Sequence, residues 1–366
     1  MTLTLDTPGD SQTPSGFRPK ARLGFNTRVS FSDHDGPAAG LRDGIRLFQA
    51  AEELGYQSGW AYQRHFDHYL SSPLPFFAAA GQHAHRITFG SAVIPMRYQE
   101  PVLLAEAAAT TDLLIDGRLE LAISTGELAP FDAVFGAVET DARTEARRRQ
   151  RIFLDALDGA TLHTVDGPGQ GAPEGTELRV TPHSPTLRSR IRQGSASLDS
   201  AVQAAELGIG LITGTVLHGH PDDEPFADYQ ARVIEAYRTR WRELWDTEPP
   251  SVAVAASILP GTTPELREKY AAYDLERRTQ GIAASRPAGA LTPVGQAAEP
   301  LGNRICPVHH GTPDEVIEGV LGNAGLALAD EIILFLPPGF GLEENVRLLT
   351  DLATTVAPAL GWTPAS

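Results

Sequence analysis

The chain has 366 residues, 42% of them hydrophobic, so it is long enough for one large domain and disorder throughout is excluded. Acidic residues outnumber basic ones by 46 to 30, and the net charge of -16 argues against nucleic acid or an anionic membrane as the main partner. Cys306 is the single cysteine, which rules out an intramolecular disulfide and is typical of a cytoplasmic protein.

The amino-terminal end is polar. Residues 1–20 lack the apolar stretch of a signal peptide, so we expect a disordered lead-in. The sequence contains no run of about 18 apolar residues, so no transmembrane helix is predicted. The histidines are scattered and do not have the spacing of a zinc site, so no metal centre is predicted.

Strands and helices alternate through the first third of the chain. Short apolar runs predict the strands, and apolar residues at helical spacing predict the helices. Such alternation with short connections is typical of a parallel sheet built from βα units. The predicted strands cover residues 21–27, 58–62, 87–94 and 119–124, and the predicted helices cover residues 37–55, 73–85 and 102–115.

The rest of the chain repeats this rhythm less regularly. Two stretches rich in Gly and Pro, residues 158–189 and 260–311, interrupt the alternation of strands and helices. The second stretch shows no clear strand, although residues 264–278 have a helical pattern. The predicted strands cover residues 191–194, 209–213, 252–259 and 331–336, and the predicted helices cover residues 140–157, 198–207, 226–245, 313–321 and 342–360.

Eight strands, each followed by a helix, favour a single (β/α)8 TIM barrel over residues 21–366, with excursions at about 158–189 and 260–311. An open, doubly wound sheet is the alternative. Active sites of such barrels lie at the carboxyl ends of the strands. Ser124, Thr125 and Gly126 end one strand with small residues that let a ligand approach the backbone.

A second strand end has a pattern that suits an anion. Gly194, Ser195, Ala196 and Ser197 directly precede a predicted helix, whose free N–H groups and dipole attract negative charge. The same residues also fit simple capping of the helix by Ser197. Both interpretations stay open on the residues alone.

Several of these stretches together resemble the bacterial luciferase-like family of flavin-dependent monooxygenases. Their order and spacing carry the resemblance, while residues 127–190 and 217–310 contribute little. The matching blocks are residues 50–56, 60–66, 86–93, 105–106, 112–121, 194–197, 204–208 and 311–316.

The resemblance implies a (β/α)8 barrel that binds reduced FMN or, in one branch, the deazaflavin F420, at the carboxyl ends of the strands. It places Ala92 and Val93 under the flavin ring, where the family often has a non-proline cis peptide. Ser124 and Thr125 would face the flavin. Gly194, Ser195, Ala196 and Ser197 would hold the phosphate.

The sequence departs from the luciferase pattern at the second strand end. Where luciferases have two histidines, this chain has Arg64 and His65, and Ser124 and Thr125 replace a cysteine and an arginine. Light emission is therefore not expected. Arg64 stays protonated at neutral pH, so it suits stabilising an anion, while His65 is either a general base or a structural residue. Neighbours on a strand face opposite sides, so only one of the two is expected to face the mouth. The resemblance makes the Arg64 position the inward one, so we expect Arg64 to meet the flavin or substrate at the solvated mouth and His65 to support it.

The primary hypothesis is a monooxygenase that uses reduced FMN, supplied by a separate reductase, and O2 on a small organic substrate. The alternatives are an F420-dependent oxidoreductase on the same barrel and a flavin-binding protein without turnover. Residues 260–311 are the predicted lid. The strongly apolar helices at 73–85 and 102–115 predict a homodimer.

Overall fold

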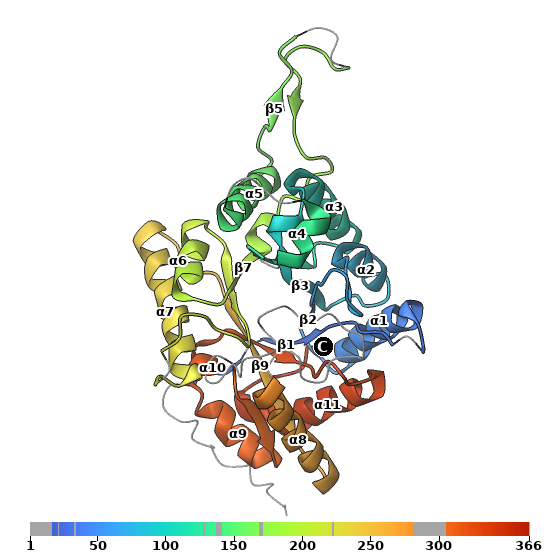
Figure 1. Ribbon diagram of the computed structural model, residues 1–366, viewed down its shortest axis with the longest axis vertical. Helices are drawn as coiled ribbons and strands as arrows, with labels where there is room; N and C mark the ends of the chain where they lie inside the picture. Colours follow the sequence, from blue (N-terminus) through green and yellow to red (C-terminus); the bar gives the residue numbers. More distant parts are fainter. Residues whose placement is uncertain are drawn as a thin grey trace, which may run out of the picture.

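The computed structural model describes residues 17–365 apart from 21, 33, 127–128, 137–140, 168–170, 222 and 281–304. Eight parallel strands form a closed barrel, in which β8 pairs with β9 and β11 pairs with β1 (Figure 1). The predicted (β/α)8 fold is confirmed. The barrel strands are β1 (Arg22–Thr27), β2 (Ser58–Ala61), β3 (Thr88–Pro95), β4 (Leu119–Ser124), β7 (Ile191–Ser195), β8 (Gly210–Thr213), β9 (Val252–Pro260) and β11 (Glu331–Phe335).

Helices surround the barrel and cover its outer face (Figure 1). Side chains that point outward from the strands pack on them, as Phe25 of β1 does on Phe48, with ring centroids 5.0 Å apart. No helix among the described residues is long and apolar enough to cross a membrane. The helices are α1 (Pro37–Glu53), α2 (Pro73–Ala80), α3 (Pro101–Leu114), α4 (Ala129–Phe135), α5 (Ala142–Leu157), α6 (Leu198–Glu206), α7 (Phe226–Leu244), α8 (Pro264–Gln280), α9 (Pro313–Leu321), α10 (Ala324–Leu328) and α11 (Leu342–Thr355).

The middle of the barrel interior is apolar. Trp60 is its largest side chain and is fully buried, and Gly90 leaves the room for its ring, since a Cβ there would lie 2.3 Å from the indole. This layer separates the amino-terminal end of the barrel from its mouth at the carboxyl ends of the strands. It consists of Trp60, Ala122, Ile212, Ala253, Ala255 and Ile333, with Ala92 and Val93 packed against it.

The amino-terminal end of the barrel is closed by a buried ionic network. Glu120 accepts from Arg22 at 2.7 Å and from Arg192 at 3.1 Å, and both arginines lie 3.7 Å from Glu331. Ser58 donates to Glu331. Burial raises the pKa of Glu331, whereas for Glu120 burial is outweighed by Arg192 and Arg22, so its pKa is lowered. Two cations and two carboxyl groups thus form ion pairs with one another, with Arg22 partly exposed and with Arg22 Nε and Glu331 Oε2 not hydrogen-bonded to any described group.

The two excursions are more structured than their composition predicts. Residues 158–189 contain a small antiparallel hairpin of β5 (His163–Thr164) and β6 (Glu177–Leu178), which projects from the barrel (Figure 1). The prediction of no strand in 260–311 is wrong, because β10 (Val308–Gly311) pairs with the end of β9. Its short polar sequence gives no alternating signal. Residues 281–304 lie outside the described residues, so the predicted lid stays a prediction.

The end of the predicted lead-in is anchored to the barrel. Lys20 is buried, and its Nζ donates to the carbonyl oxygens of Ala327 and Ala329 at 3.1 and 2.6 Å. Burial lowers the pKa of Lys20 to about 8. Phe17 is also buried, beneath the ammonium group. The expectation of disorder is therefore wrong for residues 17–20, whereas residues 1–16 lie outside the described part.

Candidate active site

A cavity of about 190 Å³ opens at the carboxyl ends of β2, β3 and β4. It brings together five residues that the sequence singled out: Arg64, His65, Val93, Ser124 and Gly126. Thr125 is not among its lining residues. The cavity is lined by Tyr62, Gln63, Arg64, His65, Val93, Pro95, Tyr98, Ser124, Gly126 and Phe131.

The floor of this cavity is formed where β3 meets β4 and β7. The peptide bond between Ala92 and Val93 is cis, as the family resemblance implied, and the register with β4 shifts at this point. Gly194 of β7 faces Val93, and a Cβ at Gly194 would lie 2.5 Å from its Cγ1. Only glycine therefore leaves Val93 in place, so Gly194 acts on the cavity through Val93 and does not itself line it.

The turn of residues 194–197 is organised around a hydroxyl group that the sequence did not reveal. Ser200 Oγ accepts from the backbone N–H groups of Ala196 and Ser197 at 3.2 and 3.1 Å. Ser195 Oγ lies 2.8 Å from the same atom, and Ser197 caps α6 by accepting from the N–H of Ser200. The capping interpretation is thus observed, and the role in holding a phosphate stays a prediction.

Arg64 is buried and held by an ion pair. Its side chain is 5% exposed, and its Nε lies 2.7 Å from Oδ2 of Asp67, whose side chain is fully buried. The predicted solvated position for Arg64 is therefore wrong. Because β2 already ends at Ala61, strand alternation does not separate Arg64 from His65, and both line the cavity. Asp67, three residues on, was not foreseen.

His65 lies among aromatic rings. The centroid of Phe135 is 4.9 Å away, and those of Phe66, Tyr98 and Phe131 are 6.1 to 6.3 Å away. Burial lowers the pKa of His65, so the imidazole is neutral at pH 7. Within the described residues its buried Nε2 has no hydrogen-bond partner. A neutral imidazole with a free nitrogen beside a cavity is chemically able to accept or pass a proton.

The neighbouring part of the mouth, after β1, has buried polar atoms without hydrogen-bond partners among the described residues. Asn26, at the end of β1, is 6% exposed, and its Oδ1 accepts no hydrogen bond from any described group. Arg28 follows two residues later and stacks on the rings of Tyr62 and Tyr69, each 5.0 Å from its Cζ. Each ring contributes about 0.5–2 kcal/mol. The rings leave Nε and Nη1 of Arg28 unbonded, and an unmet buried donor costs about 1–3 kcal/mol.

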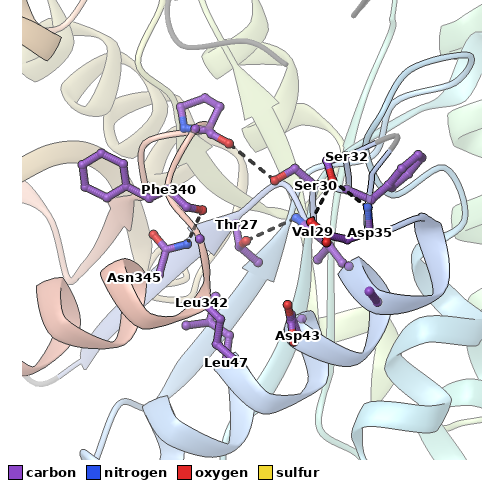
Figure 2. Close-up of a pocket in the computed structure, with 17 residues that line it drawn as sticks. Thr27, Val29, Ser30, Ser32, Asp35, Asp43, Leu47, Phe340, Leu342 and Asn345 are labelled. Atoms are coloured by element: carbon purple, nitrogen blue, oxygen red, sulfur yellow. Dashed lines mark hydrogen bonds between the residues drawn. The ribbon is translucent and has the colours of Figure 1, made fainter. Parts of the chain in front are cut away.

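A larger cavity, about 520 Å³, lies outside the barrel wall between the loops that follow β1 and β11 (Figure 2). Thr27 Oγ1 accepts from the N–H of Val29, and Ser30 Oγ donates to the carbonyl oxygen of Pro338, so the two loops are tied together beside it. None of the residues selected from the sequence lines this cavity. We therefore place the candidate active site at the smaller one.

Comparison with known proteins places the chain in a family. The sequence model of the luciferase-like monooxygenases matches residues 22–329. Among curated proteins, 4-hydroxyprotoasukamycin monooxygenase of Streptomyces nodosus subsp. asukaensis is 29% identical over 177 residues, 48% of this chain and 45% of the relative. The F420-dependent glucose-6-phosphate dehydrogenase of Kribbella flavida is 33% identical over 157 residues, 38% of this chain and 47% of the relative. The chain thus spans less than half the length of each of these two curated relatives.

Among solved structures, the oxygenating constituent of 3,6-diketocamphane monooxygenase of Pseudomonas putida, in complex with FMN, superposes with a TM-score of 0.66. It is 17% identical, and the alignment covers 93% of this chain and 98% of the other. At that identity the likeness shows a shared fold.

Proposed function

Because the chain belongs to the luciferase-like monooxygenase family, we propose that it is a flavin-dependent monooxygenase that uses reduced FMN and O2 on a small organic substrate. The family contains both monooxygenases and F420-dependent oxidoreductases, and it makes this protein an enzyme. The single observation that carries the choice of site is the convergence of Arg64, His65, Val93 and Ser124 on one cavity at the mouth.

The residues at the mouth fit a flavin ring. Val93 and Gly194 leave a floor with no side chain rising from β7. The buried Oδ1 of Asn26 is an acceptor in need of a donor, which the N–H on the edge of an isoalloxazine ring supplies. Reduced FMN, when bound, supplies the electrons with which O2 is activated. The turn of residues 194–197, ahead of α6, is the proposed phosphate position.

The chain's own residues position the reaction. Arg64, fixed by Asp67, offers a positive charge that does not have to reorganise when negative charge develops in the cavity. His65 supports it from within the aromatic cluster of Phe66, Tyr98, Phe131 and Phe135. Its free Nε2 is placed to hold or pass a proton.

The second candidate is an F420-dependent oxidoreductase, favoured by the likeness to the dehydrogenase of Kribbella flavida. The Asn26 acceptor and the Val93 floor suit the ring of either cofactor. Titrating the purified protein without oxygen, first with reduced FMN and then with reduced F420, separates the two. Tight binding of reduced FMN, followed by substrate-dependent oxygen uptake with an added flavin reductase, is the expected result. Binding of F420 alone would overturn the proposal, and FMN binding without oxygen uptake would leave a flavin-binding protein.

We further propose that the protein forms a homodimer through α3. Leu103 and Leu114 of this helix are 63% and 56% exposed, which is a large apolar surface for an outer helix. Replacing both with Glu is expected to give a monomer, measured by light scattering at micromolar concentration. Leu244→Glu, which changes an exposed leucine on α7, is the matched control and should leave the dimer intact. A monomeric mass for the unaltered protein contradicts the proposal.

A further inference from the structure

Four arginines are buried in the part of the chain that the structure describes, and they fall into two pairs. Arg64 and Arg192 each lie beside a carboxylate, that of Asp67 or of Glu120. Arg28 and Arg277 form no ion pair with a carboxylate among the described residues, although the charge of Asp274 acts on Arg277 and the chain carries a net charge of -16. Both of these arginines lie at the mouth of the barrel.

Arg28 is held there by the chain that leaves β1. It is 9% exposed, and its Cζ lies 5.4 Å from the ring centroid of Phe335, at the end of β11. The next residue, Val29, has a φ of 47°, an uncommon conformation for a β-branched residue. Its buried side chain packs in the core. The backbone therefore keeps Arg28 in a place where its Nε and Nη1 find no acceptor among the described residues.

Arg277 reaches the same ring from α8. Its Cζ lies 5.6 Å from the centroid of Phe335, and it donates to Ser257 Oγ and, at 3.3 Å, to Cys306 Sγ. Burial raises the pKa of Tyr273, and the charges of Arg277 and Arg28 oppose this rise, so both guanidinium groups lie near its hydroxyl group. Asp274 acts on Arg277 alone, so two like charges gathered in this buried place favour the binding of a further anion.

We propose that Arg28 and Arg277 recognise a carboxylate group of the substrate, so that the substrate is an organic acid with an apolar or aromatic body. Guanidinium groups suit planar carboxylates because their N–H groups match both oxygens. The rings of Tyr62, Tyr69 and Phe335 beside Arg28 suit the apolar body. The identification of this acid as the substrate rests on the proposed function, whereas the binding of the acid does not.

The position of the two arginines favours the substrate over the cofactor as the source of the anion. The proposed phosphate position follows β7, which lies four strands from β1 in either direction around the closed barrel. Arg28 follows β1, and Arg277 contacts Ser257 of β9. The two anion positions therefore lie on different sides of the mouth, and one FMN phosphate does not serve both.

Thermal unfolding of the cofactor-free protein tests the proposal. The probes are acetate, benzoate and phenylacetate at matched ionic strength, each compared with its neutral amide. The proteins are the unaltered chain, Arg28→Met, Arg277→Met and the control Arg240→Met, which removes the same charge from the exposed face of α7. At least one carboxylate is expected to raise the midpoint of the unaltered protein and of the control by several degrees, while its amide does not.

In Arg28→Met and Arg277→Met, the carboxylate is expected to leave the unfolding midpoint unchanged, because both variants bind it at least tenfold more weakly. Without ligand, Arg28→Met should unfold at or above the midpoint of the unaltered protein, because a buried charge without a counterion has been removed. A lower midpoint with unchanged carboxylate binding would show a purely structural arginine and overturn the proposal, as would the absence of any carboxylate effect on the unaltered protein.

A parallel titration with reduced FMN separates the two sources of the anion. If Arg28→Met weakens FMN tenfold and leaves carboxylate binding intact, the anion belongs to the cofactor and the proposal fails. If the unaltered protein binds carboxylates through Arg28 but neither reduced FMN nor reduced F420, the carboxylate site stands and the proposed function fails.

Discussion

The two ends of the barrel interior use buried charge in opposite ways. At the amino-terminal end, Arg22, Arg192, Glu120 and Glu331 all form ion pairs within the protein, although Arg22 Nε and Glu331 Oε2 make no hydrogen bond with the described residues. At the mouth, Asn26, Arg28 and nearby His65 have buried polar atoms with neither a hydrogen bond nor an ion pair among the described residues. The layer around Trp60 separates the two ends.

This difference distinguishes stabilising groups from groups available to a ligand. A closed network loses free energy when one member is removed, because the remaining charge is left buried and uncompensated. A buried polar group without a partner already lowers the stability of the folded protein. Removing such a group should therefore raise the free energy of unfolding and weaken only ligand binding. In (β/α)8 barrels the amino-terminal end is the stabilising one and the carboxyl end the active one.

Glu120→Ala is the strongest test of this comparison. It leaves Arg22 and Arg192 facing the single carboxyl group of Glu331, so we expect a loss of about 3–5 kcal/mol in the free energy of unfolding. Urea denaturation measures this loss. Glu243→Ala, which breaks the exposed pair with Arg240, is the control and should cost at most about 1 kcal/mol. Equal effects of the two variants would remove the distinction between the buried network and a surface pair.

The roles of Arg64 and His65 form the second test. Arg64→Ala alone would leave Asp67 buried and unpaired, so it should cost stability as well as activity, contrary to what the sequence suggested. We therefore propose the double variant Arg64→Gln with Asp67→Asn, which removes the pair together. Turnover should fall about 100-fold, as for other lost groups that stabilise developing negative charge.

His65→Ala is the comparison for that variant. It should lower turnover about tenfold if the imidazole only supports the site, since general acid–base catalysis is worth about 100-fold or more. Product formation and the thermal midpoint are measured for both variants. If His65→Ala abolishes turnover while the double variant keeps it, the assignment is reversed and His65 is the catalytic residue.

Measuring the free energy of unfolding against pH tests a partly buried group at the carboxyl ends of the strands. Burial, and then the charge of His310, lower the pKa of His309 to about 4, and its Nε2 lies 3.3 Å from the side-chain amide of Asn323. The unfolded chain takes up this proton near pH 6.5, whereas the folded chain does not. Stability should therefore fall by about 2 kcal/mol as pH drops from 6.5 to 5.

His309→Gln should flatten that part of the profile, because the proton uptake by the unfolded chain is removed. His34→Gln is the control, since the side chain of His34 is 92% exposed. An unchanged slope in His309→Gln would show that another group accounts for the acid sensitivity.

The fold was largely predictable because hydrophobic periodicity reports local structure. All eight barrel strands lie where apolar runs predicted them, in part because parallel strands buried on both faces leave continuous apolar stretches. Short elements such as α4, α10 and β10 were not predicted, because 4 to 7 residues are too few to show a hydrophobic periodicity. The ordered end of the amino-terminal lead-in was not predicted, because Lys20 is held by backbone carbonyl groups that sequence patterns do not reveal.

The candidate site was predictable only in part. Arg64, His65, Val93 and Ser124 were found through the family resemblance and a strand-end argument. Asp67 and Ser200 were missed because each acts through one contact that depends on the local path of the chain. The approach of Arg28 and Arg277 to one ring was missed because they lie far apart in the sequence, and no local pattern joins them.

The position of Trp60 gives this protein an internal optical reporter. Its indole Nε1 donates to Ser58 Oγ at 2.9 Å, and Ser58 in turn donates to Glu331, so the ring is linked to the charged network at the closed end. The same ring belongs to the layer on which Ala92 and Val93 rest. Its fluorescence is therefore sensitive both to the local field at the closed end and to a chromophore that enters from the mouth. Events at either end of the barrel are open to measurement by emission, without an attached dye.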